Sequence, residues 1–265
     1  MNLMEATGRD AASEVVLSVT GLTKRFGGVQ AVGDVDFDVP AGQLLALIGP
    51  NGAGKTTCFN MLNGQLRPDA GRIRLSGRDI TGLAPRAVWR LGVSRTFQIT
   101  QTFVSMTVQQ NVQMALLSHR KRLFAIGRHA GDLYLDEALA LLRRVGMHEH
   151  ATRSCAVLAY GDLKRVELAM ALANNPTLLL MDEPTAGMAP KERLALMALT
   201  AEIVRERSMS VLFTEHDMDI VFAHADSIIV LDRGRIIARG TPAEVRDHPE
   251  VRRVYLGSGS MYGHA

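Results

Sequence analysis

Cysteine is scarce in this chain. Cys58 and Cys155 are its two thiols among 265 residues, and neither belongs to a CxxC pair or to a cysteine and histidine cluster. A disulfide framework or a thiolate metal site needs several such residues at short spacing. The sequence therefore argues against both and favours a reducing, cytosolic compartment.

Long hydrophobic runs are also missing. The longest apolar stretches cover residues 44–48, 178–181 and 228–231, whereas a helix that crosses a bilayer needs about 20 apolar residues. Residues 1–14 mix acidic, basic and small side chains and lack the basic start and apolar stretch of a signal peptide. We expect a flexible N-terminus over 1–14 and no secretion signal, so that any membrane role depends on a partner.

No strong charge imbalance is present, since 30 basic and 27 acidic residues leave a net charge of +3. This mild basic bias identifies no partner. Basic patches that bind nucleic acid need supporting aromatic or groove-entering elements. We therefore interpret the basic residues at 119–122 and 128–129 as a solvated connection between helices and expect no nucleic-acid partner.

Hydrophobic periodicity divides the chain into three parts. Residues 15–19 and 35–39 have strand-like content, and the second stretch alternates strictly, as in a half-buried antiparallel strand. Three helices are expected in the middle, at 108–117, 135–145 and 163–173. Strands at 178–181, 211–214, 228–231 and 235–238 then accompany helices at 192–207 and 219–224, a rhythm that predicts a parallel sheet. We expect one α/β domain over 15–250, a helical insert at about 100–173 and a C-terminal tail at 251–265.

A glycine-rich loop lies between an apolar strand at 43–48 and a predicted helix. It matches the pattern G-x-x-x-x-G-K-[ST], in the strand, loop and helix context that this pattern requires. Glycines let several backbone N–H groups point at one phosphate, and the helix N-terminus adds partial positive charge. We expect Lys55 to reach the β- and γ-phosphates and the Thr56 hydroxyl to bind Mg²⁺. The nucleotide-binding residues predicted here are Gly49, Pro50, Asn51, Gly52, Ala53, Gly54, Lys55, Thr56 and Thr57.

Two carboxylates end a second apolar strand, at Asp182 and Glu183. Adjacent side chains on a strand point to opposite faces, so the two can do different work. Asp182 is predicted to hold the Mg²⁺ shell and Glu183 to polarise the attacking water. His216 follows a further strand, where strand ends converge in an open α/β sheet, and is predicted to contact the γ-phosphate.

A turn of small residues opens the helix that precedes these carboxylates. It consists of Leu158, Ala159, Tyr160, Gly161 and Asp162, and it is predicted to form a second anion site. Gln98 closes a short segment further upstream, where its amide could reach Mg²⁺ and the nucleophilic water.

Taken in order, these motifs resemble the ATP-binding subunit of ATP-binding cassette (ABC) transporters over nearly the whole chain. The resemblance implies a P-loop NTPase of the ABC ATPase type, with an N-terminal antiparallel β subdomain, a RecA-like parallel-sheet core and a helical insert. It implies ATP and Mg²⁺ as ligands and a peripheral location on the cytoplasmic side of the membrane. It also implies a second ATP-binding subunit, transmembrane permease subunits and, indirectly, a substrate-binding protein as partners.

The resemblance also assigns roles to single residues. Phe26 corresponds to the aromatic residue that stacks on adenine, and Gln98 lies in the loop that contacts the membrane subunit. Residues 158–162 correspond to the signature motif, which completes the site of the opposing subunit. Glu183 corresponds to the catalytic base and His216 to the switch histidine.

The likeness is closer to the branched-chain or hydrophobic amino-acid importers. Leu-Ala-Tyr-Gly stands where Leu-Ser-Gly-Gly is common, and residues 186–190 and 254–257 also look like that branch. Three departures from the family pattern bear on the chemistry. Ala159 lacks the hydroxyl that bonds a γ-phosphate across the dimer, Ala189 lacks a frequent carboxylate, and Asp162 adds negative charge or caps the helix.

The docking surface and two other functions stay open on sequence alone. Ile99, Phe103 and Met106 fit a groove for a permease helix and ordinary core packing about equally well.

A cassette that exports lipopolysaccharide or another lipid shares almost every motif, although Leu-Ala-Tyr-Gly argues against it. A soluble cassette clamp acting on DNA or ribosomes is expected to carry two cassettes or a coiled-coil insert, and a small-molecule kinase explains neither the signature turn nor Glu183.

Overall fold

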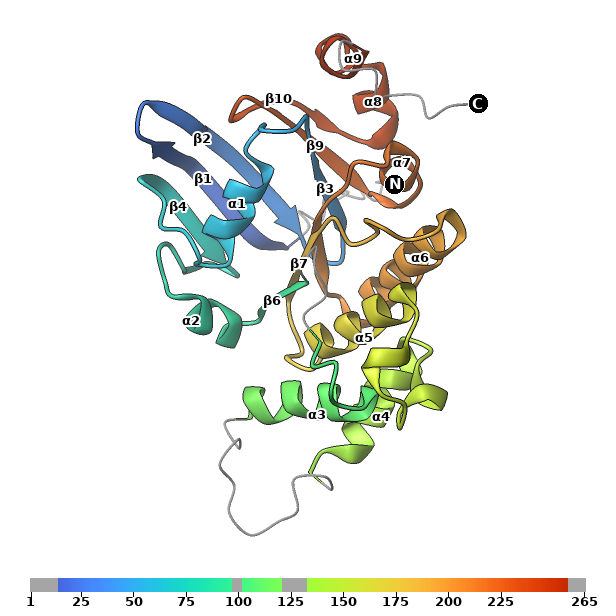
Figure 1. Cartoon of the computed structure of the whole chain (residues 1–265). Coiled ribbons are helices and arrows are strands. Elements are labelled where there is room, and N and C mark those ends of the chain that lie inside the picture. Colours follow the sequence, from blue (N-terminus) through green and yellow to red (C-terminus); the bar gives the residue numbers. More distant parts are fainter. Residues whose placement is uncertain (1–13, 97–101, 121–132, 257–265) are drawn as a thin grey trace, which may run out of the picture.

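The computed structural model describes residues 14–96, 102–120 and 133–256 (Figure 1). Gln98 and Ile99 lie outside these ranges, as does the N-terminal segment 1–13. Within the described ranges, none of the helices combines the length and the apolarity that a bilayer crossing requires.

An antiparallel sheet forms the N-terminal part, with strand order β2-β1-β4-β5. Its strands are β1 (Val15–Phe26), β2 (Val29–Pro40), β4 (Ala70–Leu75) and β5 (Arg78–Asp79). The alternation in β2 has the predicted effect, because Val35, Phe37 and Val39 are buried while the aspartates between them are exposed. Both long strands continue well beyond the stretches predicted from sequence.

A six-stranded sheet forms the core, in the order β10-β9-β3-β8-β7-β6. Its strands are β3 (Leu44–Ile48), β6 (Val93–Thr96), β7 (Leu178–Asp182), β8 (Ser210–Thr214), β9 (Ser227–Asp232) and β10 (Arg235–Gly240). All neighbours pair in parallel except β9 and β10, which form an antiparallel pair. Because parallel strands point the same way, the residues that follow β3, β7 and β8 meet at one edge of the sheet.

Each face of this sheet packs into its own hydrophobic core. Alternate residues of β3 divide between the two, with Leu44, Ala46 and Ile48 on one face and Leu45 and Leu47 on the other. The second face packs against the antiparallel sheet and α1 (Lys55–Leu62). Burial on both faces explains why this strand is continuously apolar rather than alternating.

The remaining helices cover the first face or extend from it, except α2 (Pro85–Arg90), whose buried Val88 belongs to the core of the second face. The helical part contains α3 (Val108–His119), α4 (Leu135–Arg144) and α5 (Tyr160–Leu172), which lie together in the lower half of Figure 1. Two short 3-10 turns, His148–His150 and Cys155–Val157, connect α4 to α5. The others are α2 (Pro85–Arg90), α6 (Pro190–Arg207), α7 (Met218–His224), α8 (Pro242–Asp247) and α9 (Pro249–Leu256).

Two expectations from sequence need correction. The helix expected from residue 163 begins at Tyr160 instead, so most of the signature turn is already helical. The C-terminal tail expected from residue 251 does not begin there, because α9 continues to Leu256. Val251 and Tyr255 are buried in the core, and this burial holds the segment against the rest of the domain.

Candidate functional site

The glycine loop has backbone φ angles that residues with a side chain rarely adopt. Gly52 and Gly54 have φ angles of +79° and +106°, and Gly49 lies at +153°. A Cβ at Gly49 would collide with the carbonyl oxygen of Leu231, and one at Gly54 with that of Ala31. The loop therefore needs glycine for its left-handed turns and for its close approach to neighbouring backbone.

Lys55 begins α1 and folds back over this loop. Its ammonium donates hydrogen bonds to the carbonyl oxygens of Gly49, at 2.7 Å, and Pro50, at 3.2 Å. Burial lowers the pKa of Lys55, while the negative charges of Glu183 and Asp182 act in the opposite direction. The ammonium is thus held at the mouth of the loop, among groups that a phosphate can replace.

A cavity of about 190 Å³ opens in front of the loop. Its lining comprises Ala31, Asn51, Gly52, Ala53, Gly54, Lys55, Thr56, Thr57, Glu183 and His216. The predicted loop, base and histidine therefore meet around one space, although they lie far apart in sequence. None of the lining residues comes from the turn at 158–162.

Asp182 ends β7 with both carboxylate oxygens hydrogen-bonded. The Thr214 hydroxyl donates to Oδ1 at 2.9 Å, and the Arg95 guanidinium donates to Oδ2 at 2.7 Å. A carboxylate and a hydroxyl are hard oxygen donors of the kind that Mg²⁺ prefers, so Asp182 and Thr56 fit the predicted metal. In the described ranges no group of three or more acidic, histidine or cysteine side chains forms a separate metal centre.

Glu183 and His216 are in direct contact, with 2.8 Å between Oε1 and Nε2. Glu183 has a left-handed φ of +48°, which is costly for a residue with a side chain. Its backbone N–H lies 3.1 Å from the Thr214 hydroxyl and 3.2 Å from the Thr214 carbonyl oxygen, and it donates to both. This strained position turns the carboxylate toward the cavity.

Glu215 is a buried carboxylate that sequence reasoning did not identify. It accepts hydrogen bonds from the Thr185 hydroxyl at 2.7 Å and from the Thr185 N–H at 2.9 Å. Its other oxygen accepts from the His216 N–H at 3.3 Å. Burial raises the pKa of Glu215 most, the hydrogen bonds lower it, and the charge of Glu183 raises it further. Glu215 thereby joins the turn after β7 to the histidine after β8.

Tyr255 of α9 supports the loop from behind. Burial raises the pKa of its phenol, and the Gly49 N–H donates a hydrogen bond to the phenolic oxygen. The residues 254–257 were noted in the sequence for a family likeness alone. The structure adds a physical contact between this segment and the phosphate loop.

The turn at 158–162 stands at the start of α5, apart from the cavity. Ala159 is the N-cap residue and provides no side-chain cap, and Asp162 lies in the first helical turn. Tyr160 is 40% exposed, with its ring packed beside Gly187. Gly161 lies against the Glu192 carboxylate, which leaves little room for a larger residue. At the N-terminus of α5, Ala159 and Tyr160 are exposed and can contact another molecule, whereas Gly161 is buried.

Phe26 is half-exposed at the end of β1. The Lys24 ammonium lies 5.8 Å from the centre of its ring. An exposed aromatic face at the rim of the domain is compatible with stacking on a base. The role of Gln98 stays a prediction, because the residue lies outside the described ranges.

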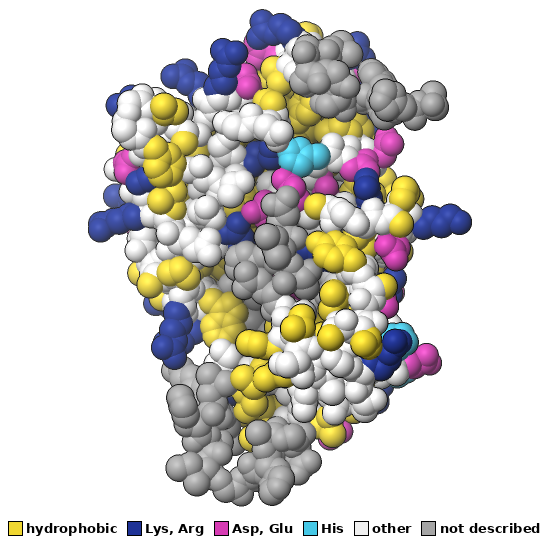
Figure 2. Space-filling model, in the orientation of Figure 1, with side chains coloured by type: hydrophobic (Ala, Val, Ile, Leu, Met, Phe, Trp, Pro, Cys, Tyr) yellow, Lys and Arg dark blue, Asp and Glu magenta, His cyan; other side chains and the backbone are white. Residues whose placement is uncertain are grey.

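A largely apolar groove of about 310 Å³ separates the core sheet from the helical part. Residues of α2, β6, α3 and α5 line it, including Trp89, Arg95 and Glu167. Phe103 and Val104 are also strongly exposed on the helical part. Figure 2 shows hydrophobic side chains gathered in the lower half of this face, where the helical part lies.

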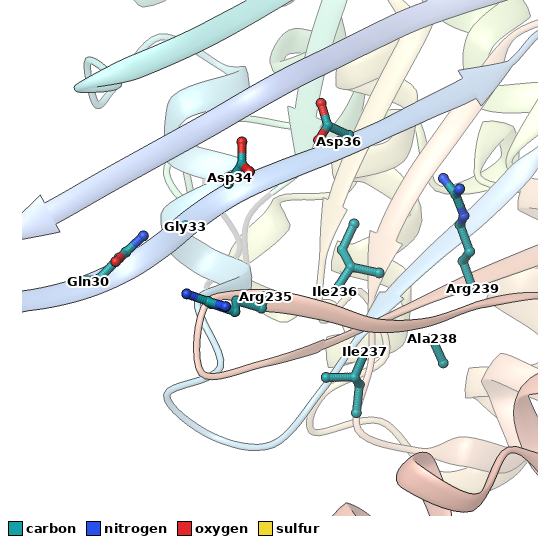
Figure 3. A pocket seen from close by; sticks show the side chains of 9 residues that line it. All are labelled: Gln30, Gly33, Asp34, Asp36, Arg235, Ile236, Ile237, Ala238 and Arg239. Atoms are coloured by element: carbon teal, nitrogen blue, oxygen red, sulfur yellow. The ribbon is translucent and has the colours of Figure 1, made fainter.

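A larger cavity, of about 520 Å³, lies elsewhere, between β2 and β10. Figure 3 shows Asp34 and Asp36 on β2 and Arg235 and Arg239 on β10 around it. It contains charges of both signs and none of the predicted site residues. Its size alone does not make it the chemical centre, so the smaller cavity at the glycine loop remains the candidate site.

Comparisons with known proteins show the family of this chain. The family model described as ABC transporter matches residues 32–186, and one described as branched-chain amino acid ATP-binding cassette transporter matches residues 235–260. The chain is 42% identical over 252 residues to the high-affinity branched-chain amino acid transport ATP-binding protein LivG of Salmonella typhimurium, covering 92% of this chain and 99% of that protein. The same identity and coverage hold for BraF of Pseudomonas aeruginosa, a protein with the same description.

A solved structure gives the same picture at the level of the fold. The ADP conformation of an ATP-binding cassette of an ABC transporter matches with a TM-score of 0.82 and 30% identity. The match covers 92% of this chain and 99% of that one.

Proposed function

This chain belongs to the ABC transporter family of ATP-binding subunits, and we propose that it hydrolyses ATP to drive import of branched-chain or other hydrophobic amino acids. The observation that carries the catalytic part is the shared cavity in front of the glycine loop. Lys55, Glu183 and His216 all line it, which supports one site for phosphate binding and hydrolysis.

Glu183 is assigned the general base. A base must lie within hydrogen-bond reach of the water that it activates, and the Glu183 carboxylate faces the cavity that the loop encloses. His216 holds this carboxylate from the side and is assigned contact with the γ-phosphate. Lys55 exchanges its carbonyl partners for phosphate oxygens when nucleotide binds.

Thr56 and Asp182 are assigned the Mg²⁺ site, together with Gln98. Bound there, the ion neutralises the charge that develops on the β- and γ-phosphates. The protein contributes the hydroxyl of Thr56 at the start of α1 and a carboxylate of Asp182 held by Thr214 and Arg95.

A second ATP-binding subunit, identical or related, is proposed to complete the site. The accessible turn at 158–162 would then face the phosphate loop of the partner, and Phe26 would stack on the adenine. Since Ala159 has no hydroxyl, backbone N–H groups and the partial charge at the N-terminus of α5 must carry this contact.

Transmembrane permease subunits are the proposed partners at the groove beside Trp89. The groove is apolar, lies between two parts of the domain, and borders the strand β6 that leads toward Gln98. A helix presented by the permease would fill it and hold the chain at the cytoplasmic face of the membrane. A substrate-binding protein would act on the same complex indirectly.

Reconstitution of the full transporter in liposomes tests the proposal. ATP-dependent uptake of labelled leucine, with hydrolysis stimulated by the permease, is the expected result. ATP-dependent release of lipid without uptake of amino acid would replace import by lipid export. Hydrolysis stimulated by nucleic acid and not by the permease would overturn both transport assignments.

A further inference from the structure

Arg95 joins the edge strand β6 to the carboxylate that ends β7. Its Nη2 lies 2.7 Å from Oδ2 of Asp182, and the two side chains are 8% and 13% exposed. Ion pairs on open surfaces contribute little because water screens them. This pair is largely shielded from water, so the attraction between Arg95 and Asp182 is screened less than that of a surface pair.

The guanidinium is also anchored from the opposite side. Its Nη1 donates to Oδ1 of Asn60 at 2.7 Å and to Oε1 of Gln65 at 3.1 Å. Asn60 belongs to α1, the helix that begins at the glycine loop, and Gln65 follows that helix. These hydrogen bonds hold the planar guanidinium at several points. The positive charge therefore stays beside Asp182.

From this geometry we propose that Arg95 is a positioning residue that serves as the resident counter-charge of Asp182 and keeps divalent cations from that carboxylate until nucleotide is present. The proposal rests on the assignment of Asp182 to the metal shell. It goes beyond that assignment, because it gives Arg95 a role in controlling when the Asp182 carboxylate can bind a divalent cation.

The physical reason is electrostatic balance. Without nucleotide, Asp182 is neutralised by Arg95, and Lys55 lies close enough for the charge of Asp182 to affect its pKa. A divalent cation at Asp182 would have to displace or lie beside the Arg95 guanidinium, which is 2.7 Å from Oδ2, and this opposes its binding. The phosphates of a nucleotide bring several negative charges to the same place, which reverses the balance.

Binding of Mn²⁺ to the nucleotide-free full chain tests the proposal, since electron paramagnetic resonance detects free and bound Mn²⁺ directly. Wild type and Arg95→Lys should bind Mn²⁺ weakly. Arg95→Gln, which keeps a hydrogen-bond donor but removes the charge, should bind it at least about tenfold more tightly. Adding Asp182→Asn to Arg95→Gln should abolish this gain.

Two outcomes overturn the proposal. One is an Arg95→Gln variant that binds Mn²⁺ no more tightly than wild type. The other is an Arg95→Lys variant that gains as much as Arg95→Gln, which would mean that the shape of the guanidinium matters and its charge does not. If the tighter Mn²⁺ binding of Arg95→Gln persists after Asp182→Asn is added, the proposal is also overturned, because the metal is then held elsewhere.

Folding is checked separately. Arg95→Met removes both the charge and every hydrogen-bond donor to the poorly exposed Asp182 and can unfold the chain, whereas Arg95→Gln keeps a donor and therefore carries the test. The emission of Trp89, the one tryptophan in the sequence, reports the groove that Arg95 also lines. Failure of the proposed function would instead appear as wild type that does not bind MgATP. That measurement is made with nucleotide present, so it is separate from the Mn²⁺ test.

Discussion

The carboxylate of Glu183 and the imidazole of His216 are in contact at 2.8 Å, although the two residues lie 33 positions apart in the sequence. One follows β7 and the other follows β8, and these strands pair in parallel. The proposed base and the proposed γ-phosphate contact therefore form one hydrogen-bonded unit, and such a preorganised pair limits the reorganisation needed for hydrolysis.

Glu183→Gln should keep ATP binding but reduce turnover by about two orders of magnitude or more, the scale of a lost general base. Phosphate release measured under saturating ATP gives the rate, and equilibrium titration gives the affinity. Glu206→Gln, on the exposed side of α6, is the matched control. An unchanged rate would remove Glu183 from the role of base.

Lys55→Ala should weaken nucleotide binding by about tenfold or more, because it removes a charge-assisted bond to phosphate. Titration with a fluorescent ATP analogue measures the affinity. Lys191→Ala removes an exposed lysine elsewhere and should bind normally. Equal affinity in the two variants would contradict the assignment of the loop.

His216→Ala should leave nucleotide binding nearly intact and slow hydrolysis, because it removes the group that holds Glu183 from the side. Comparing kcat with KM separates the two effects. His148→Ala, outside the site in a short 3-10 turn, provides the control. A rise in KM with unchanged kcat would show that the histidine serves binding rather than the reaction.

Glu215 should make the protein less stable as pH rises. Burial is the main cause that raises the pKa of Glu215 in the folded state. The folded protein therefore holds a proton on Glu215 at pH values where the unfolded chain, with a pKa near 4.5, has lost it. Stability then falls with pH from about 4.5 upward to the folded-state pKa. Urea unfolding of wild type and Glu215→Gln at several pH values measures this, and parallel curves for the two proteins would contradict it.

The thiols should be unreactive in the native state. Burial raises the pKa of Cys58 to about 12 and also raises the pKa of Cys155. Since the thiolate is the reactive form, alkylation at pH 8 should label neither residue until denaturant is added. Mass spectrometry counts the labels, and rapid modification of Cys58 in the folded chain would contradict its burial.

Much of the site follows from local sequence because its main parts are continuous motifs. The loop from Gly49 to Thr57 needs glycines at positions where a Cβ would collide with backbone, and that need is visible in the residues themselves. Asp182 and Glu183 end a strand, and His216 follows another, so the rule for parallel sheets brings them to one edge. The contact between Glu183 and His216 agrees with that expectation.

The partners of these residues could not be predicted in the same way. Arg95 reaches Asp182 across 87 positions of chain, and Glu215 reaches Thr185 across 30. Neither residue belongs to a recognisable pattern, and a single arginine or glutamate is usually solvated. Residues 251–265 were expected to form a C-terminal tail, whereas α9 runs to Leu256 and Val251 and Tyr255 pack inward.

The residues by themselves thus determined the phosphate loop, the two carboxylates, the histidine and the alternation of strands and helices, because each depends on neighbours along the chain. The tertiary structure alone decided which cation neutralises Asp182, which carboxylate fixes the turn beside Glu183, and how Tyr255 supports Gly49. Those contacts depend on strand register and on which side chains share a buried space, and both arise only when distant segments pack together.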